Sequence, residues 1–219
     1  MKKRWWWLVP IALSIAAIVY FLPQTERVPT VPIARAQASQ TTAGPIYESK
    51  ATKPICVSEA VPVGDCIPQR FANLPPDPGP KGMETVEGID SDNDGVRDDL
   101  QRIIVLNWGH SERAVQSLRL IAINTQRRIQ LADSVSRDQA HEIAKEMSKG
   151  TFCYLRSVDP SIQKGRASDA IRAAAVNTEE RFRRKSAFEY QAAHRIYDLP
   201  PDDTPLTAFC GYDPALLNN

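Results

Sequence analysis

The run Asp90–Asp99, which reads DSDNDGVRDD, constrains the fold of this chain more than any other stretch. It places five acidic side chains within ten residues, and carboxylates this close repel one another unless a cation lies among them. Asp90, Asp92 and Asp94 alternate, and Gly95 follows at a position where a sharp turn needs a positive φ. The stretch therefore predicts a tight loop around a hard cation, with a helix directly after the loop.

The positions from Asp90 to Gln101 supply the predicted ligands for Ca²⁺, which takes six to eight oxygens at about 2.3–2.6 Å and suits such a cage better than Mg²⁺ does. Gln101 stands where an EF-hand places a bidentate Glu, so one ligand oxygen and one negative charge are lost, and Asp99 is an alternative ligand. The other interpretation is a bare acidic turn that favours a helix N-terminus. The predicted metal ligands are Asp90, Asp92, Asp94, the backbone carbonyl of Val96, Asp98 and Gln101.

The first six loop positions match the pattern Asp-x-[Asp/Asn]-x-[Asp/Asn]-Gly and resemble the loops of EF-hands, dockerins and thrombospondin type-3 repeats. EF-hands usually occur in pairs, whereas this sequence has one such loop and a proline-rich segment before it. The closer resemblance is to the lone-loop kind, which implies a weak structural site in which the metal caps the helix that follows.

The N-terminus predicts a membrane segment. Residues 1–4 are basic after the initiator Met, and residues 5–22 form an apolar run about long enough to span a bilayer. We expect residues 1–4 to stay cytoplasmic and the rest of the chain to lie in the periplasm, as a single-pass protein of a bacterial inner membrane. The alternative is a signal peptide cleaved near Ala34-Arg35-Ala36, which would leave a periplasmic or secreted protein.

Four cysteines, an even number, favour disulfides in an exported chain. Three pairings are open. One of them joins Cys56 to Cys66 in a small local loop and Cys153 to Cys210, which would tie the C-terminal tail to the helical body. Together with the N-terminal segment, the stretch Gly88–Asp99 and these cysteines also resemble a group of exported bacterial proteins. That resemblance implies an envelope location and nothing about mechanism.

Residues 23–82 are rich in proline and predict an extended, poorly packed tether that contains a disulfide loop. Residues 83–219 predict an all-α domain, a small helical bundle entered through the acidic loop. Apolar spacing of three and four residues predicts helices over about 98–107, from Ser111 to about Leu131, and after the capping box Ser136–Gln139, with Gly150 weakening or ending the third. Ser168 and Asn177-Thr178 are the predicted caps of a short Ala-rich helix and a last long helix.

No local motif predicts an enzyme. His141-Glu142 begins like a zinc-protease helix, but Lys145 replaces the second His, which leaves His141 as an expected exposed helical residue. The formal net charge is +1, so nothing predicts nucleic-acid binding, and the basic runs 127–128 and 181–185 are expected to form solvated, salt-bridged helix faces.

The sequence favours a membrane-anchored module that binds an unidentified envelope protein or polymer. The alternative is an envelope hydrolase whose site is assembled from residues distant in sequence.

Overall fold

The computed structural model describes residues 53–56, 66–193, 195 and 200–219, all of which belong to one unit of the chain, Pro45–Asn219. The predicted cytoplasmic end and membrane segment, residues 1–22, lie outside the described residues. Within the described ranges, no helix combines the length and apolar character needed to cross a membrane.

The described residues are helical, which confirms the predicted all-α class. The one pairing of extended backbone found among them is a single bridge between Ile55 and Ile67. The α-helices are α2 (Asp98–Trp108), α3 (Glu112–Leu131), α4 (Arg137–Ser157), α5 (Pro160–Lys164), α6 (Ala167–Ala175), α7 (Glu179–Ala192) and α8 (Thr207–Cys210), and the 3₁₀ helices are η1 (Gln69–Phe71), η2 (Gly79–Met83) and η3 (Pro214–Leu216).

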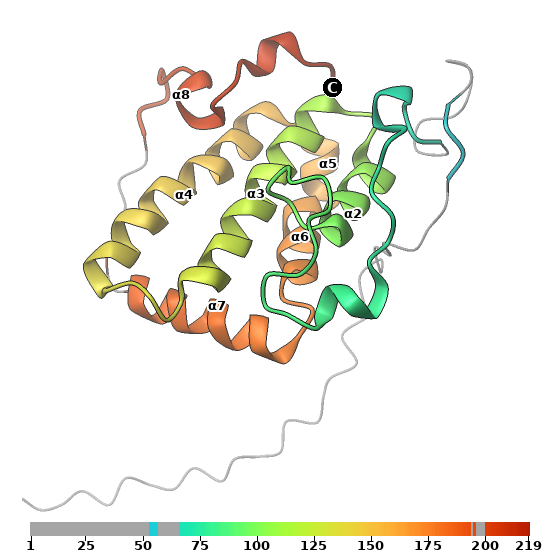
Figure 1. Ribbon diagram of the computed structural model, residues 1–219. Helices are drawn as coiled ribbons and strands as arrows, with labels where there is room; N and C mark the ends of the chain where they lie inside the picture. Colours follow the sequence, from blue (N-terminus) through green and yellow to red (C-terminus); the bar gives the residue numbers. More distant parts are fainter. Residues whose placement is uncertain (1–52, 57–65, 194, 196–199) are drawn as a thin grey trace, which may run out of the picture. The chain divides into compact units, whose positions relative to one another are not determined.

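Helix α3 lies at the centre of the bundle and packs against α2, α4, α6 and α7 (Figure 1). The apolar faces predicted from spacing are the faces that are buried. Leu100 and Ile104 of α2 meet Val115, Leu118 and Ala122 of α3 in the main core, and all five side chains are almost fully removed from water. Burial of such side chains contributes roughly 1.5–3 kcal/mol each for Leu, Ile and Val. The core therefore fixes α2, and with it the acidic loop that precedes α2, against α3.

Polar caps set where the helices begin. Ser111 Oγ accepts the Ala114 N–H at the start of α3, and Thr178 Oγ1 accepts the Arg181 N–H at the start of α7. Both hydrogen bonds of the predicted capping box are present at the start of α4, between Ser136 and Gln139. Each such cap satisfies a backbone N–H that has no partner inside its helix and contributes about 1 kcal/mol.

Two local predictions are wrong. Helix α4 continues through Gly150 to Ser157, because Gly150 lies where α3 and α4 cross closely. A Cβ atom at position 150 would come within 2.7 Å of Asn124 Nδ2, so glycine serves helix packing here and does not end the helix. The short Ala-rich helix α6 begins at Ala167, with Arg166 in the left-handed region as its N-cap residue, and Ser168 lies inside it.

The described end of the proline-rich segment packs on the bundle, although its composition predicts poor packing. Ile67 is buried against Val105 and Leu106 of α2, and Phe71 and Leu74 lie beside them. Proline removes backbone donors without removing apolar side chains, so the segment covers α2 as irregular chain. The Pro75 carbonyl accepts a hydrogen bond of 2.8 Å from Arg102 Nη1.

The cysteines pair locally and across the bundle. Cys56 bonds to Cys66, and Cys153 of α4 bonds to Cys210 of α8, which selects one of the three pairings left open by the sequence. Beside the second disulfide, Tyr212 OH lies 3.1 Å from Ser117 Oγ on α3. The tail is thus held to the helical body by a covalent bond and by a partly buried polar contact.

Candidate metal centre

The acidic loop folds back on itself before α2 begins. Asp90 uses both carboxylate oxygens: Oδ1 accepts the Asp94 N–H at 3.1 Å, and Oδ2 accepts the Gly95 N–H at 2.9 Å. Gly95 has a φ of +87°, the left-handed turn predicted at this position. At the other end, Asp98 Oδ1 accepts the Ser91 N–H at 2.9 Å. These bonds bring the first and ninth loop positions together.

Three of the predicted ligands converge at this closure. Carboxylate oxygens of Asp90, Asp92 and Asp98 all lie within 4.8 Å of one another. Asp98 is buried, Asp90 is partly buried and Asp92 is exposed. Burial raises the pKa of the Asp90 carboxyl, and the nearby negative charge of Asp94 acts in the same direction, while backbone N–H donors from Gly95 and Asp94 oppose the rise. A site that disfavours its own negative charge in this way is one that a cation would stabilise.

Asp94 is not part of this triad, and its carboxylate pairs with the Arg119 guanidinium. Its Oδ2 forms an ion pair with Arg119 Nη1 of α3 at 2.5 Å, and its Oδ1 accepts the Val96 N–H at 2.8 Å. The Val96 side chain is fully buried in the main core. Arg119 therefore supplies a fixed positive charge at one of the predicted ligand positions, which leaves fewer free carboxylate oxygens for a metal.

Gln101 carries an orphaned polar atom at the site. Its Nε2 donates to Asp92 Oδ2 at 3.1 Å and to Asp94 Oδ2 at 2.8 Å, while its Oε1 is buried without a hydrogen-bond partner. A half-turn of the amide would exchange the two atoms and direct an oxygen toward the carboxylates, an arrangement that is favourable only with a cation between them. The donor set is made of oxygens, which are the ligands that Ca²⁺ prefers. The residues therefore fit a hard divalent cation.

Gln126 of α3 forms two hydrogen bonds with the backbone of the loop. Its Oε1 accepts the Arg97 N–H at 3.1 Å, and its Nε2 donates to the Gly95 carbonyl at 3.2 Å. Gln126 is buried, so these two bonds satisfy a side chain that would otherwise be costly to desolvate. The loop is consequently anchored to the core by a neutral amide as well as by the Arg119–Asp94 ion pair.

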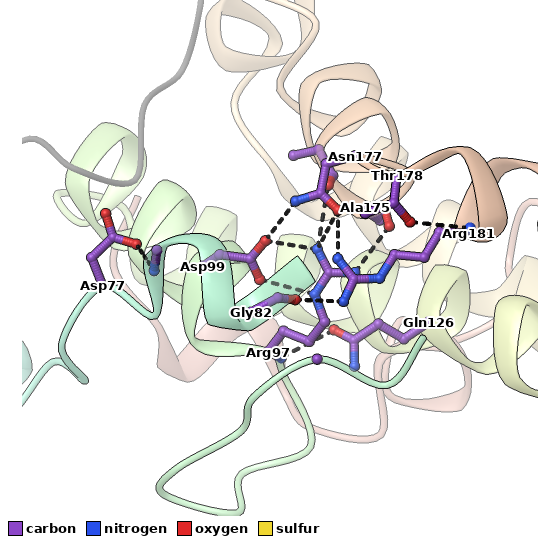
Figure 2. A network of polar contacts seen from close by, with 12 residues as sticks. Asp77, Gly82, Arg97, Asp99, Gln126, Ala175, Asn177, Thr178 and Arg181 are labelled. Carbon is purple, nitrogen blue, oxygen red and sulfur yellow. Dashed lines mark hydrogen bonds and ion pairs between the residues drawn. The ribbon is translucent and has the colours of Figure 1, made fainter. Parts of the chain in front are cut away.

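Two arginines are buried at the acidic loop, Arg97 within the loop and Arg181 on α7, and no motif in the sequence marks either (Figure 2). Arg97 forms a bidentate pair with Asp99, at 2.9 Å and 2.7 Å, and donates to the Ala175 carbonyl at the end of α6. Arg181 of α7 donates to Asn177 Oδ1, which also accepts from Arg97. The two guanidinium groups thus share the Asn177 side-chain oxygen, while the Asp99 carboxylate pairs with Arg97 and accepts from Asn177 Nδ2. The negative end of the α6 dipole offsets part of the surplus positive charge.

Arg181 also fixes the chain that leads into the loop. Its guanidinium donates to the carbonyls of Gly82, Thr85 and Val86, at 2.6, 2.7 and 3.0 Å. Burial, together with the positive charge of Arg97, lowers the pKa of Arg181. Gly88 allows this approach, because a Cβ there would lie 2.6 Å from Arg97 Cδ and 2.9 Å from Arg181 Nη2.

The prediction of a solvated face for residues 181–185 is therefore wrong at Arg181, whose side chain is 0% exposed. Arg183 does lie in solvent, where it pairs with Glu180 at 2.7 Å, and Arg184 pairs with Asp133 beyond the end of α3. A sequence signal for the buried position does exist. Arg181 precedes Phe188, the buried aromatic of α7, by seven residues, which places both on one helix face.

His141 also departs from expectation, because it is 2% exposed rather than on the helix surface. It follows Ala140, which packs with Ala132 and Phe188 in a separate core cluster between α4 and α7. Its burial favours a structural role for His141 in the packing of α4.

No protein-family model matches this chain, and no curated protein or solved structure does so either.

Proposed function

We propose that this chain is a membrane-anchored extracytoplasmic module that binds an envelope partner, with Ca²⁺ in the acidic loop as a structural clip. The observation that carries the calcium part is the convergence of Asp90, Asp92 and Asp98 at the entrance to α2. The orphaned Gln101 Oε1 beside them supports it independently of the acidic charges.

In this proposal Asp90, Asp92, Asp98 and Gln101 hold the ion, with the Val96 carbonyl as a further ligand. The ion offsets the repulsion among the carboxylates and fixes how the chain enters α2. Asp98 is both a ligand and the first residue of α2, so the site and the helix N-terminus share one side chain. The bound ion would hold the proline-rich segment, which precedes the loop, at a fixed angle to the bundle.

Two features support the extracytoplasmic part. Both cysteine pairs are at bonding distance, and such bonds persist in oxidising compartments. Extracellular calcium modules work with Kd values of roughly 10⁻⁴–10⁻³ M, an affinity that a loop with Gln101 in place of Glu is suited to give. The anchor itself is proposed from residues 5–22.

Removing calcium is expected to lower the melting temperature of the full-length protein. At a calcium concentration ten times the Kd, binding contributes about 1.4 kcal/mol, which corresponds to roughly 3–6 °C for a chain of this size. Thermal unfolding with 10 mM CaCl₂, about ten times the weakest Kd expected, and with excess EDTA measures the difference. The variant Asp92→Ala should abolish it, because Asp92 is exposed and its loss leaves the backbone hydrogen bonds of the loop intact.

Asp203→Ala is the matched control, since Asp203 is an exposed aspartate of the C-terminal segment. It should keep the full response to EDTA. A melting curve of the parent protein that is the same with calcium and with EDTA would remove the metal from this account. Asp94→Ala is a less specific test than Asp92→Ala, because it also breaks the Arg119 ion pair.

Gln101→Glu is expected to tighten calcium binding by about tenfold, because it restores the bidentate carboxylate of an EF-hand. In EDTA the same variant should melt at a lower temperature than the parent, since the new carboxylate faces Asp92 and Asp94 without the amide donor. Calorimetric titration and thermal unfolding measure the two effects. Gln101→Met, which supplies no oxygen ligand, should weaken binding; equal affinities for the Glu and Met variants would exclude position 101 as a ligand.

The partner is tested by cross-linking and affinity isolation of the full-length protein from envelope membranes, with calcium and with EDTA. A partner recovered in a calcium-dependent manner by the parent and lost with Asp92→Ala would support the module. If the partner is recovered equally with calcium, with EDTA and with Asp92→Ala, partner binding does not depend on the calcium site.

A further inference from the structure

A cavity of about 250 Å³, with no residue of the acidic loop in its lining, lies between α3, α4 and the C-terminal segment. Leu120, Asn124 and Arg127 face it from α3, where their spacing of four and three residues places them on one helix face. The other walls are formed by residues 146, 147, 149 and 150 of α4 and by residues 208–211. Since a water molecule occupies about 30 Å³ in the liquid, this volume accommodates a ligand of roughly ten non-hydrogen atoms.

The cavity is apolar in its depth and charged at its rim. Leu120 and Phe209, both part of the cluster beside the Cys153–Cys210 disulfide, supply apolar surface. The charged residues lining the cavity are Arg127, Glu146 and Lys149. Glu146 and Lys149 pair with each other at 2.8 Å, so the charge left over is that of Arg127, which forms no ion pair within the described residues.

The neighbouring arginine shows why Arg127 is distinctive. Arg128 turns toward α7 and α4, where it contacts Glu189 Oε1 and Met147 Sδ, each at 3.5 Å. Arg127 instead remains exposed at the cavity rim. The basic pair in the sequence is thus divided into one arginine that holds helices together and one whose guanidinium is available for a carboxylate.

The walls of the cavity are fixed before any ligand arrives. Gly150 lets α4 approach α3 so closely that Asn124 Nδ2 donates to the Met147 carbonyl at 3.1 Å. The remaining wall is tied to α4 by the Cys153–Cys210 bond. A preformed site of this kind loses less conformational entropy on binding.

We propose that this cavity binds a small monocarboxylate with an apolar body, its carboxylate paired with Arg127 and its body against Leu120 and Phe209. The site is separate from the acidic loop and does not depend on calcium. A carboxylate is favoured over a larger anion because one guanidinium forms two parallel hydrogen bonds with it and the rim carries a surplus of one positive charge.

The probe is 3-phenylpropionate, titrated into the full-length protein and followed by NMR, with 3-phenylpropan-1-ol and acetate as comparison compounds. We expect millimolar binding of the acid and at least tenfold weaker binding of both other compounds, since one lacks the charge and the other the apolar body. Arg127→Gln should weaken the acid at least tenfold and leave the alcohol unchanged.

Arg137→Gln is the matched control, because Arg137 is an exposed arginine in the first turn of α4, roughly 15 Å along the helix from Met147. It should bind the acid as the parent does. Equal affinity for acid and alcohol, or for the parent and Arg127→Gln, would overturn the proposal. The response of melting temperature to EDTA should be the same in parent and Arg127→Gln, which keeps this test independent of the proposed calcium clip.

Discussion

Replacing Arg181 with Met is expected to lower the free energy of unfolding by about 3–5 kcal/mol, because four hydrogen bonds from a buried side chain are lost at once. The methionine fills a similar volume but leaves the Gly82, Thr85 and Val86 carbonyls and Asn177 Oδ1 without the donor they share. The Gly82 carbonyl is buried, and an unpaired buried acceptor costs about 1–3 kcal/mol. The Thr85 and Val86 carbonyls are less enclosed and lose less, and Asn177 Oδ1 keeps Arg97 as a second donor. Equilibrium unfolding in urea measures the difference.

Arg183→Met is the control for this prediction, since Arg183 lies on the same helix with its side chain 57% exposed and one exposed partner. It should unfold at the same urea concentration as the parent. Arg181→Lys should fall between the two, because an ammonium carries the charge but cannot direct donors to four acceptors at once. If Arg181→Met were as stable as Arg183→Met, the network would not hold the segment.

Removing the Cys153–Cys210 disulfide is the second large effect. The bond closes a loop with a sequence separation of 57 residues, and the chain-entropy model gives a loss of about 4 kcal/mol when it is absent. The double variant Cys153→Ala/Cys210→Ala removes it without leaving buried thiols. Both cysteines are buried, so their replacement also loosens the packing of Phe209 and Tyr212. Urea unfolding of the double variant measures the total.

The matched comparison is Cys56→Ala/Cys66→Ala, whose sequence separation of 10 residues corresponds to about 3 kcal/mol in the same model. The longer loop should cost more, and its loss should also weaken binding at the cavity walled by residues 208–211. A cost below about 1 kcal/mol for Cys153→Ala/Cys210→Ala would show that the tail is held by noncovalent contacts alone.

Local sequence signals predict the helices well because their causes are local. Ser111, Thr178 and the Ser136–Gln139 box begin helices where their side chains meet orphan backbone donors. The same holds inside the acidic loop, where Asp90 and Gly95 act on neighbours within five residues. Such interactions depend on the order of residues along the chain, which is what a sequence contains.

The remaining features depend on partners far along the chain. Asp94 has the spacing of a ligand, but Arg119, 25 residues later, is what it contacts. Arg181 shares the buried face of α7 with Phe188, but the carbonyls that accept its hydrogen bonds lie 95 to 99 residues earlier. Backbone carbonyls are identical at every position, so no residue type marks these acceptors in advance.

The Arg181 contacts also have a consequence for the order of events during folding. The segment around Gly82 leaves the ribosome long before α7, so it has no guanidinium to bind until most of the bundle has been made. Contacts between residues so distant in sequence tend to close after the local helices have formed. We therefore expect the Arg181 hydrogen bonds to be absent from the folding transition state and to form only after it. Kinetic measurements on Arg181→Met should then show faster unfolding at a nearly unchanged folding rate.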